Sequence, residues 1–360
     1  MALTAVPLRP RCANPLPART RRQDAAGELP APAGLPRPAA APICRISKKF
    51  AANLAAERDA CLAGLLERPA RIEPKHFYDA VGCALFEAIC GLPEYYLTRT
   101  EARIFERHRE EIMRELPERP QWVDLGCGNC AKSEPWLNAV GASRFIGVDI
   151  ASEWLEQALA AVAPRFPGVE CIGVSTDFSG GVDLADTIGE RPGEPPVFFY
   201  PGSSLGNFTS EAAMVLLRSI RAQLGGDGCL LIGVDLVKDT GVLEAAYDDA
   251  LGVTGAFNRN ILRAMNRLLG ADFDPAGFAH RAFFDPAGSR IEMHLVANRS
   301  QSVRLGAETR RFDAGEAILT EYSHKYTIGG FARMLSDAGF GRQKVWTDDA
   351  AWFGVFLART

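Results

Sequence analysis

The residues of this sequence best suited to chemistry stand at the ends of short apolar runs. Val123–Leu125 closes one such run, and Gly126 and Gly128 follow it directly. Glycines at that point allow a sharp turn and the close approach of a ligand to the backbone. Asp149 ends the next apolar run about 20 residues later, where a carboxylate can accept hydrogen bonds from both hydroxyls of a ribose.

A third polar position completes this pattern. Asp177 follows the third apolar run, and its carboxylate can accept a hydrogen bond from an N–H group. Phe178, the next residue, offers an apolar face for adenine. A dinucleotide loop would carry a third glycine, but Ala131 and Lys132 stand there instead. The loop therefore favours a nucleoside cofactor without a pyrophosphate, and S-adenosylmethionine fits. With its glycine loop, Asp149 and Asp177 in this order, the chain resembles the Rossmann-like methyltransferases.

Charge and sequence both argue against a nucleic-acid substrate. The formal net charge is −4, which gives no general attraction to phosphate backbones. Methyltransferases that act on nucleic-acid amino groups resemble one another in an Asn/Asp-Pro-Pro-aromatic motif after the fourth strand. Here that position reads Tyr200-Pro201-Gly202-Ser203-Ser204. A small-molecule substrate is the better expectation.

Alternating apolar runs and amphipathic stretches predict a parallel sheet covered by helices. The expected core strands are Gln121–Leu125, Arg144–Val148, Glu170–Val174, Val197–Tyr200, Cys229–Val234, Gln343–Trp346 and Trp352–Leu357. The expected helices are Ala131–Val140, Ser152–Arg165, Ser210–Leu224, Leu243–Leu269 and Ile328–Ala338, with Ser152 and Ser210 as N-caps. Ligands of such an open sheet bind beyond the carboxyl ends of its strands.

After Val234 the rhythm changes to short strands, expected at Arg281–Phe284, Arg290–Ala297 and Ser302–Leu305. The fold class predicted is α/β: a Rossmann-like methyltransferase sheet with a second, smaller α+β substrate lobe. That lobe combines a mostly helical N-terminal block with an insert after the fifth strand. The expected divisions are a disordered tail (1–42), the N-terminal part of the substrate lobe (43–109), the methyltransferase core (110–238 and 326–360) and the insert (239–325).

Composition suits a cytoplasmic protein with a full core. The chain has 360 residues, 47% of them hydrophobic, and no apolar run approaches the ~20 residues of a membrane span. Its nine cysteines are scattered without paired ligand clusters, which fits reduced thiols and no metal. Cys127 and Cys130 form a C-x-x-C, but the glycine loop explains their position. We expect no membrane or nucleic-acid partner, and a monomer.

Further motifs are too specific to reflect composition alone. They are Pro74–Asp79, Leu92–Tyr96, Thr98–Glu101, Gly202–Asn207, Asp235–Asp239, Ala246–Asp249, Ala256–Asn260 and Leu319–Ser323. With them the chain resembles, from about Ser47 to Leu357, the histidine Nα-methyltransferases of ergothioneine biosynthesis. The resemblance implies a two-lobed architecture and three successive methylations of L-histidine, which give N,N,N-trimethylhistidine (hercynine).

The resemblance also implies roles for residues that match the family's motifs. It assigns the substrate carboxylate to Asn207 and Tyr247 and the imidazole to Glu321 and Ser323, and it places Tyr95, Gly202 and Met293 in the same pocket and Tyr78 at the catalytic position. It assigns the cofactor to Gly126, Gly128, Lys132, Asp149, Asp177 and Phe178. The family's loop usually reads Gly-Ser-Gly, so any side-chain contact of Cys127 is in doubt.

These assignments make physical sense for a free amino acid. Asn and Tyr supply neutral donors for a carboxylate, and Glu321 can accept the imidazole N–H. A buried carboxylate left unpaired is costly, so Glu321 also disfavours aliphatic side chains. Three alternatives stay open: the same methyl transfer to another free amino acid, a cofactor-binding regulator without catalysis, and a nicotinamide dehydrogenase.

Overall fold

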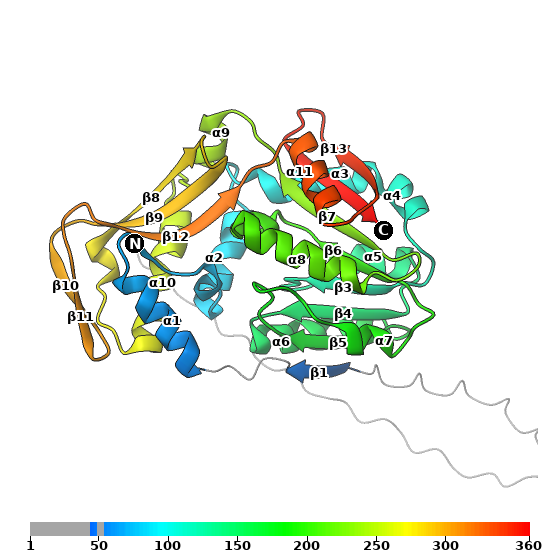
Figure 1. Ribbon diagram of the computed structural model, residues 1–360, viewed down its shortest axis with the longest axis horizontal. Helices are drawn as coiled ribbons and strands as arrows, with labels where there is room; N and C mark the ends of the chain where they lie inside the picture. The colour runs from blue at the N-terminus through cyan, green and yellow to red at the C-terminus, as the bar shows by residue number, and fades with distance from the viewer. Residues whose placement is uncertain (1–43, 49–53) are drawn as a thin grey trace, which may run out of the picture. The chain divides into compact units, whose positions relative to one another are not determined.

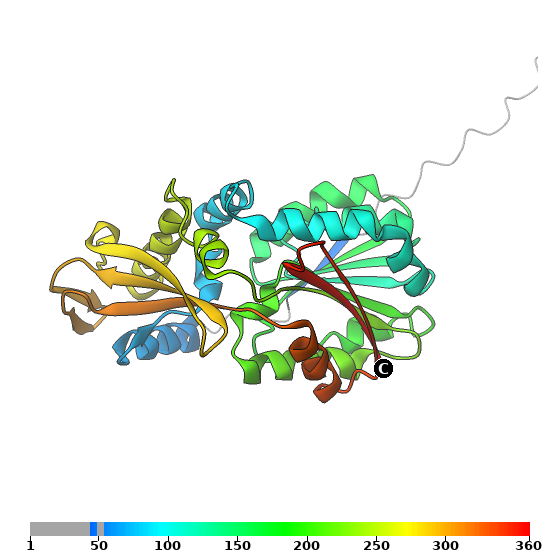
Figure 2. The ribbon, with the colours of Figure 1, turned by 90° about the horizontal axis from the view of Figure 1, so that it is seen from above.

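Two sheets organise the residues described by this computed structural model, which are 44–48 and 54–360. These residues fall within one unit, 40–360. The predicted tail, 1–42, lies outside the described residues. Figures 1 and 2 show the larger sheet between layers of helices and the smaller sheet beside it.

The larger sheet has the strand order β1-β5-β4-β3-β6-β7-β14-β13. Its strands are β1 (Cys44–Lys48), β3 (Gln121–Leu125), β4 (Arg144–Asp149), β5 (Glu170–Ser175), β6 (Pro196–Tyr200), β7 (Cys229–Asp235), β13 (Arg342–Thr347) and β14 (Phe353–Arg359). Only β14 runs antiparallel to its neighbours, β7 and β13. The predicted α/β fold class is confirmed, and each predicted core strand lies within about one residue of its expected start.

Helices cover both faces of this sheet because its strands are apolar on both sides. Along β3, Trp122 belongs to one hydrophobic cluster and Val123 and Leu125 to the other. The first cluster includes residues of α3 (Tyr96–Arg107), α4 (Arg109–Glu115), α5 (Glu134–Ala139), α6 (Ser152–Val162) and η2 (Ala163–Arg165). The second includes residues of α7 (Ala185–Gly189), α8 (Ser210–Gln223) and α11 (Ile328–Asp337).

The smaller sheet has the order β2-β12-β9-β8, and a separate hairpin pairs β10 with β11. Its strands are β2 (Ala70–Arg71), β8 (Phe278–Asp285), β9 (Arg290–Ala297) and β12 (Ala317–His324), and the hairpin is β10 (Gln301–Leu305) with β11 (Glu308–Phe312). Helices from both ends of the chain pack around it: α1 (Leu54–Leu66), η1 (Pro74–Phe77), α2 (Ala80–Cys90), α9 (Thr240–Ala245), α10 (Val253–Leu269) and η4 (Pro275–Gly277). The parallel pairing of β2 with β12 joins the N-terminal block to the insert.

Three sequence-based expectations need correction. The expected helix Leu243–Leu269 is two helices, α9 and α10, because Gly252 adopts a left-handed φ of 72° and the carboxylate of Asp249 accepts from the N–H groups of Val253 and Thr254. The sequence also gave no sign of β1 and β11. Ser152 and Ser210 are first helical residues rather than N-caps, and Thr209 caps α8. No helix of the described residues is long and apolar enough to cross a membrane.

Candidate active site

The loops after β3, β4 and β5 bring the predicted cofactor residues to one edge of the sheet. Gly126 and Gly128 have φ angles of 69° and 52°, which glycine adopts without strain. The N–H of Gly128 donates to Asp149 Oδ2 at 3.0 Å, and the N–H of Ala151 donates to Asp149 Oδ1 at 3.0 Å. Burial raises the pKa of Asp149, although these hydrogen bonds oppose the shift. The loop and the carboxylate therefore hold one another in place.

Asp177 and Phe178 form the opposite side of this edge. The Asp177 carboxylate accepts from Lys75 Nζ at 3.1 Å and from the N–H of Ser179 at 2.9 Å. Burial alone would raise the pKa of Asp177, but these donors hold it below the ordinary value. A Cβ added to Gly126 would lie 4.0 Å from the Phe178 ring, so the ring faces the glycine loop. The carboxylates of Asp149 and Asp177, the Phe178 ring and the glycine loop without side chains fit the ribose and adenine of S-adenosylmethionine.

Lys132 is held by Glu101, a residue that the sequence analysis did not single out. Lys132 Nζ donates to Glu101 Oε2 at 2.7 Å, and the N–H of Gly202 donates to Glu101 Oε1 at 2.7 Å. Glu101 lies in α3 and is only 1% exposed. A side chain at Gly233 would place its Cβ 2.1 Å from Glu101 Oε1, so the glycine makes room for this carboxylate. Glu101 thus links the glycine loop after β3 to the loop after β6.

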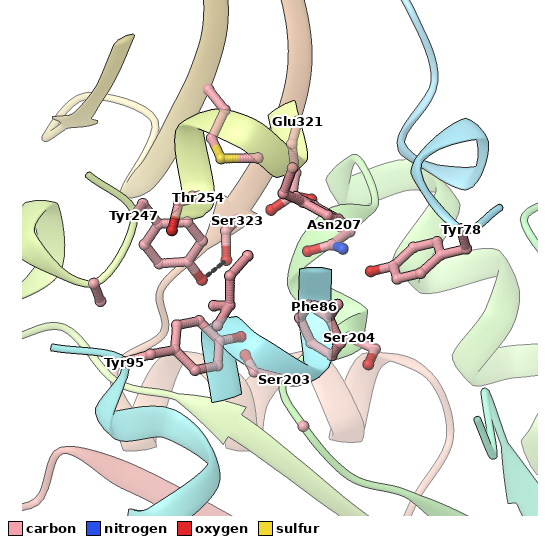
Figure 3. A pocket seen from close by; sticks show the side chains of 15 residues that line it. Tyr78, Phe86, Tyr95, Ser203, Ser204, Asn207, Tyr247, Thr254, Glu321 and Ser323 are labelled. Atoms are coloured by element: carbon pink, nitrogen blue, oxygen red, sulfur yellow. Dashed lines mark hydrogen bonds between the residues drawn. The ribbon is translucent and has the colours of Figure 1, made fainter. Parts of the chain in front are cut away.

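A cavity of about 50 Å³ lies between the two sheets and gathers every predicted substrate residue. Its predicted lining residues are Tyr78, Tyr95, Gly202, Asn207, Tyr247, Met293, Glu321 and Ser323. Figure 3 shows Tyr95, Tyr247 and Ser323 grouped on one side, with Tyr78 on the other and Asn207 between them. Segments from both lobes therefore meet at one cavity.

Strand periodicity places the two expected imidazole contacts together. Glu321 and Ser323 are two residues apart on β12, so their side chains share one face of the strand. Glu321 pairs with Met293 of β9, next to an irregularity in the register between Leu319 and Glu321. Burial raises the pKa of Glu321 from the ordinary value of 4.5 to about 7, although the charge of Lys325 opposes the shift. The carboxyl is thus poised to change its charge near neutral pH.

The tyrosines of the cavity are neutral hydroxyls. Burial raises the pKa of Tyr78 and of Tyr95 well above the ordinary value of 10, and nearby acidic groups add to the effect. The Tyr78 ring makes edge contacts with Phe86 and Phe257, at centroid distances of 6.0 and 6.1 Å. These hydroxyls can donate or accept hydrogen bonds, but they are not strong bases.

Lys325 lies behind the cavity and was not predicted. Its ammonium is fully buried and contacts Asp235 Oδ2, Tyr247 Oη and Ser323 Oγ, each at 2.9 Å. Burial alone would lower the pKa of Lys325, but the charge of Asp235 keeps it above the ordinary value. Tyr247 Oη and Ser323 Oγ are 2.8 Å apart. The two hydroxyls and the ammonium form one network.

Some residues missed in the sequence carried a usable signal. Glu101 ends the motif Thr98–Glu101, and Lys325 continues the two-residue spacing of Glu321 and Ser323. Four missed lining residues of the cavity also lie in motifs noted in the sequence: Ser203, Ser204, Ala246 and Phe257. The remaining ones, Phe86, Ile89 and Thr254, lie in none of these motifs. No group of three or more His, Cys, Asp or Glu side chains within 44–48 and 54–360 is arranged to hold a metal ion.

Comparison with known proteins decides the family. The family described as "Histidine-specific methyltransferase, SAM-dependent" matches residues 57–360. The chain belongs to this family. It is 40% identical over 321 residues to the histidine N-alpha-methyltransferase of Mycolicibacterium smegmatis, and the match covers 87% of this chain and 98% of that protein.

Two further similarities accompany this match. Ergothioneine biosynthesis protein 1 of Neurospora crassa is 30% identical over 297 residues, which cover 78% of this chain and 32% of that protein. A solved structure of an S-adenosylmethionine-dependent methyltransferase from Clostridium acetobutylicum covers 85% of this chain and 98% of that one, with 13% identity and a TM-score of 0.39. The family membership rests on the sequence matches.

Proposed function

We propose that this protein transfers methyl groups from S-adenosylmethionine to the α-amino group of L-histidine. Three successive transfers would give N,N,N-trimethylhistidine for ergothioneine biosynthesis. Family membership supports the reaction and the substrate. The observation that supports the proposal in this chain is one cavity lined by all seven expected substrate residues and by Tyr78, the expected catalytic residue.

Different residues of the cavity would bind the carboxylate, the imidazole and the α-amino group of the substrate. Asn207 and Tyr247 would bind the carboxylate with neutral donors, and Glu321 and Ser323 on β12 would bind the imidazole. The α-amino group would then lie toward Tyr78, which stands on the side of the cavity opposite Tyr95 and Tyr247 (Figure 3). Such placement fixes the attacking nitrogen before reaction, which is the main source of rate in a displacement between two bound partners.

The cofactor edge would bind S-adenosylmethionine through its nucleoside. Asp149 would accept from the ribose hydroxyls, Asp177 from the adenine amine, and Phe178 would pack on the adenine ring. Gly126 and Gly128 leave room for the close approach, and Lys132 is held at the boundary between the two sites. When bound, this cofactor supplies a methyl group on a positively charged sulfur.

The enzyme must also allow the substrate ammonium group to lose a proton before each methyl transfer. The attacking amine must be neutral, so the ammonium form of the substrate releases one proton for each methyl group received. Tyr78 is a neutral hydroxyl with a raised pKa, so it can pass a proton toward water but cannot act as a strong base. Its ring and that of Phe86 also favour a methylated cation over water contact.

Mass spectrometry tests the proposal directly. Purified protein with S-adenosylmethionine and L-histidine should yield mono-, di- and trimethylhistidine in sequence. A competitive panel of free amino acids in the same assay would separate histidine from the alternative, transfer to another amino acid. If cofactor binding is measured but no methylated histidine forms, the proposed reaction is wrong.

We also propose that the enzyme acts as a monomer in a reducing cytoplasm. None of the seven cysteines whose side chains the structure describes forms a disulfide; they are Cys61, Cys83, Cys90, Cys127, Cys130, Cys171 and Cys229. Light scattering of the active protein tests the oligomeric state.

A further inference from the structure

Lys325 occupies a position that the proposed reaction does not yet use. It follows β12 directly and is two residues beyond Ser323, so the face of the strand that carries Glu321 and Ser323 ends in a buried ammonium. An ammonium has three N–H donors and no acceptor. Its three contacts are Asp235 Oδ2, Tyr247 Oη and Ser323 Oγ, each at 2.9 Å. Each donor of Lys325 therefore has a partner.

Among the described residues, the contacts of Tyr247 and Ser323 leave one of their two hydroxyl protons without an acceptor. Both Tyr247 Oη and Ser323 Oγ accept from Lys325, so neither donates to it. Their mutual contact at 2.8 Å uses the proton of one hydroxyl only. Within the described part of the chain, the second proton has no further acceptor among the hydrogen bonds of these two groups. Both residues line the cavity, so a group bound in the cavity can supply an acceptor for this remaining O–H.

The charges around Lys325 explain why the ammonium is stable there. Asp235 is 0% exposed and also accepts from Tyr96 Oη at 2.7 Å and from Lys238 Nζ at 2.6 Å. Two cations therefore share one carboxylate, and the group as a whole carries a positive charge behind the cavity. This charge favours an anionic substrate group in front of it.

We infer that Lys325 is a positioning residue for the amino-acid substrate, because it forces the Tyr247–Ser323 pair to present a hydrogen-bond donor to the cavity. The inference rests on the proposed function and deepens it. A donor at this point matches a carboxylate oxygen or the bare nitrogen of a neutral imidazole. Glu321, on the same face of β12, offers the complementary acceptor for the imidazole N–H.

The substitution Lys325→Met tests this role, with Lys238→Met as its matched control. Both variants remove one of the two cations that contact Asp235 and leave the other in place. Only Lys325 contacts the cavity hydroxyls. We expect Lys325→Met to raise the KM for histidine about tenfold to a hundredfold, with a smaller change in kcat and an unchanged Kd for S-adenosylmethionine. Lys238→Met should leave the KM for histidine within about threefold of the wild-type value.

A mutant cycle asks whether the lysine acts through the hydroxyls. Lys325→Met is added to the double variant Tyr247→Phe with Ser323→Ala. If Lys325 only positions these groups, its substitution has little further effect on the KM once they are gone. Independent, multiplicative effects would overturn the inference, as would equal changes in KM for the Lys325 and Lys238 variants.

Thermal unfolding and the Kd for S-adenosylmethionine show whether each variant is folded, so a change in KM can be separated from a loss of folding. If Lys325→Met does not fold, Lys325→Leu carries the same measurements, because it also removes the N–H donors to Tyr247 and Ser323. An inactive wild-type protein would refute the proposed function. An active wild-type protein whose KM for histidine is unaffected by Lys325→Met or Lys325→Leu would refute only the positioning role.

Discussion

Replacing Glu321 by glutamine should make the ligand-free protein more stable at alkaline pH and less active on histidine. The carboxyl has a pKa of about 7 in the folded protein against 4.5 as the ordinary value, because it is buried in the cavity. Folding therefore favours the protonated form. The wild-type protein should lose stability as the pH rises from about 4.5 to about 7, and above pH 7 the loss is complete.

The difference of about 2.5 pKa units corresponds to about 3 kcal/mol, since one unit is about 1.4 kcal/mol. Glu321→Gln has no group to ionise at this position, so its stability should lack this pH-dependent loss. Urea unfolding of both proteins at pH 5 and pH 8 measures the difference in free energy of unfolding between the wild-type protein and the variant at each pH. The free energy of unfolding of the wild-type protein should fall relative to that of the variant between these values. Parallel pH dependence of the two proteins would refute the burial argument.

Four further variants probe the rest of the site. Asp149→Ala should weaken S-adenosylmethionine binding about tenfold to a hundredfold, because it removes a charged hydrogen-bond acceptor, and an unchanged Kd in calorimetry would show that the ribose is placed wrongly. Glu101→Gln should lower the melting temperature and weaken cofactor binding, because it strips the ion-pair partner from Lys132, whereas a variant altered in neither property would contradict the link between the two loops. Glu321→Ala should raise the KM for histidine about tenfold to a hundredfold and improve the relative use of tryptophan, while Asn207→Ala should weaken both substrates alike; kinetics on the two amino acids distinguish these outcomes.

Local signals in the sequence were sufficient for the larger sheet apart from β1, and for the edge that carries the predicted cofactor residues. The strands from Gln121 to Asp235 are mostly apolar runs, and the predicted cofactor residues Gly126, Asp149 and Asp177 stand at or just after the end of such a run. Parallel strands bring their carboxyl ends to one edge, so Gly126, Asp149 and Asp177 had to meet there. The substrate residues had no such local rule, and the resemblance to a known family identified them.

Local pattern failed where long-range contacts determine the backbone. The apolar spacing of 243–269 favours one helix, but Asp249 and Gly252 divide it and place Tyr247 at the cavity. The strand β1 depends on pairing with β5, more than 120 residues away, a distance that no local window covers.

The sequence by itself determined the fold class, the cofactor edge and, through its motifs, the predicted lining of the substrate cavity. Only the tertiary structure revealed the buried charges behind that cavity. Motif and spacing mark the positions of Glu101 and Lys325 in the sequence, but their roles become visible only when packing removes water and leaves specific partners around each of them. The cost of an unpaired buried charge depends on those partners, which come from distant segments such as Gly202 and Asp235, so tertiary contacts alone decide what such a residue does.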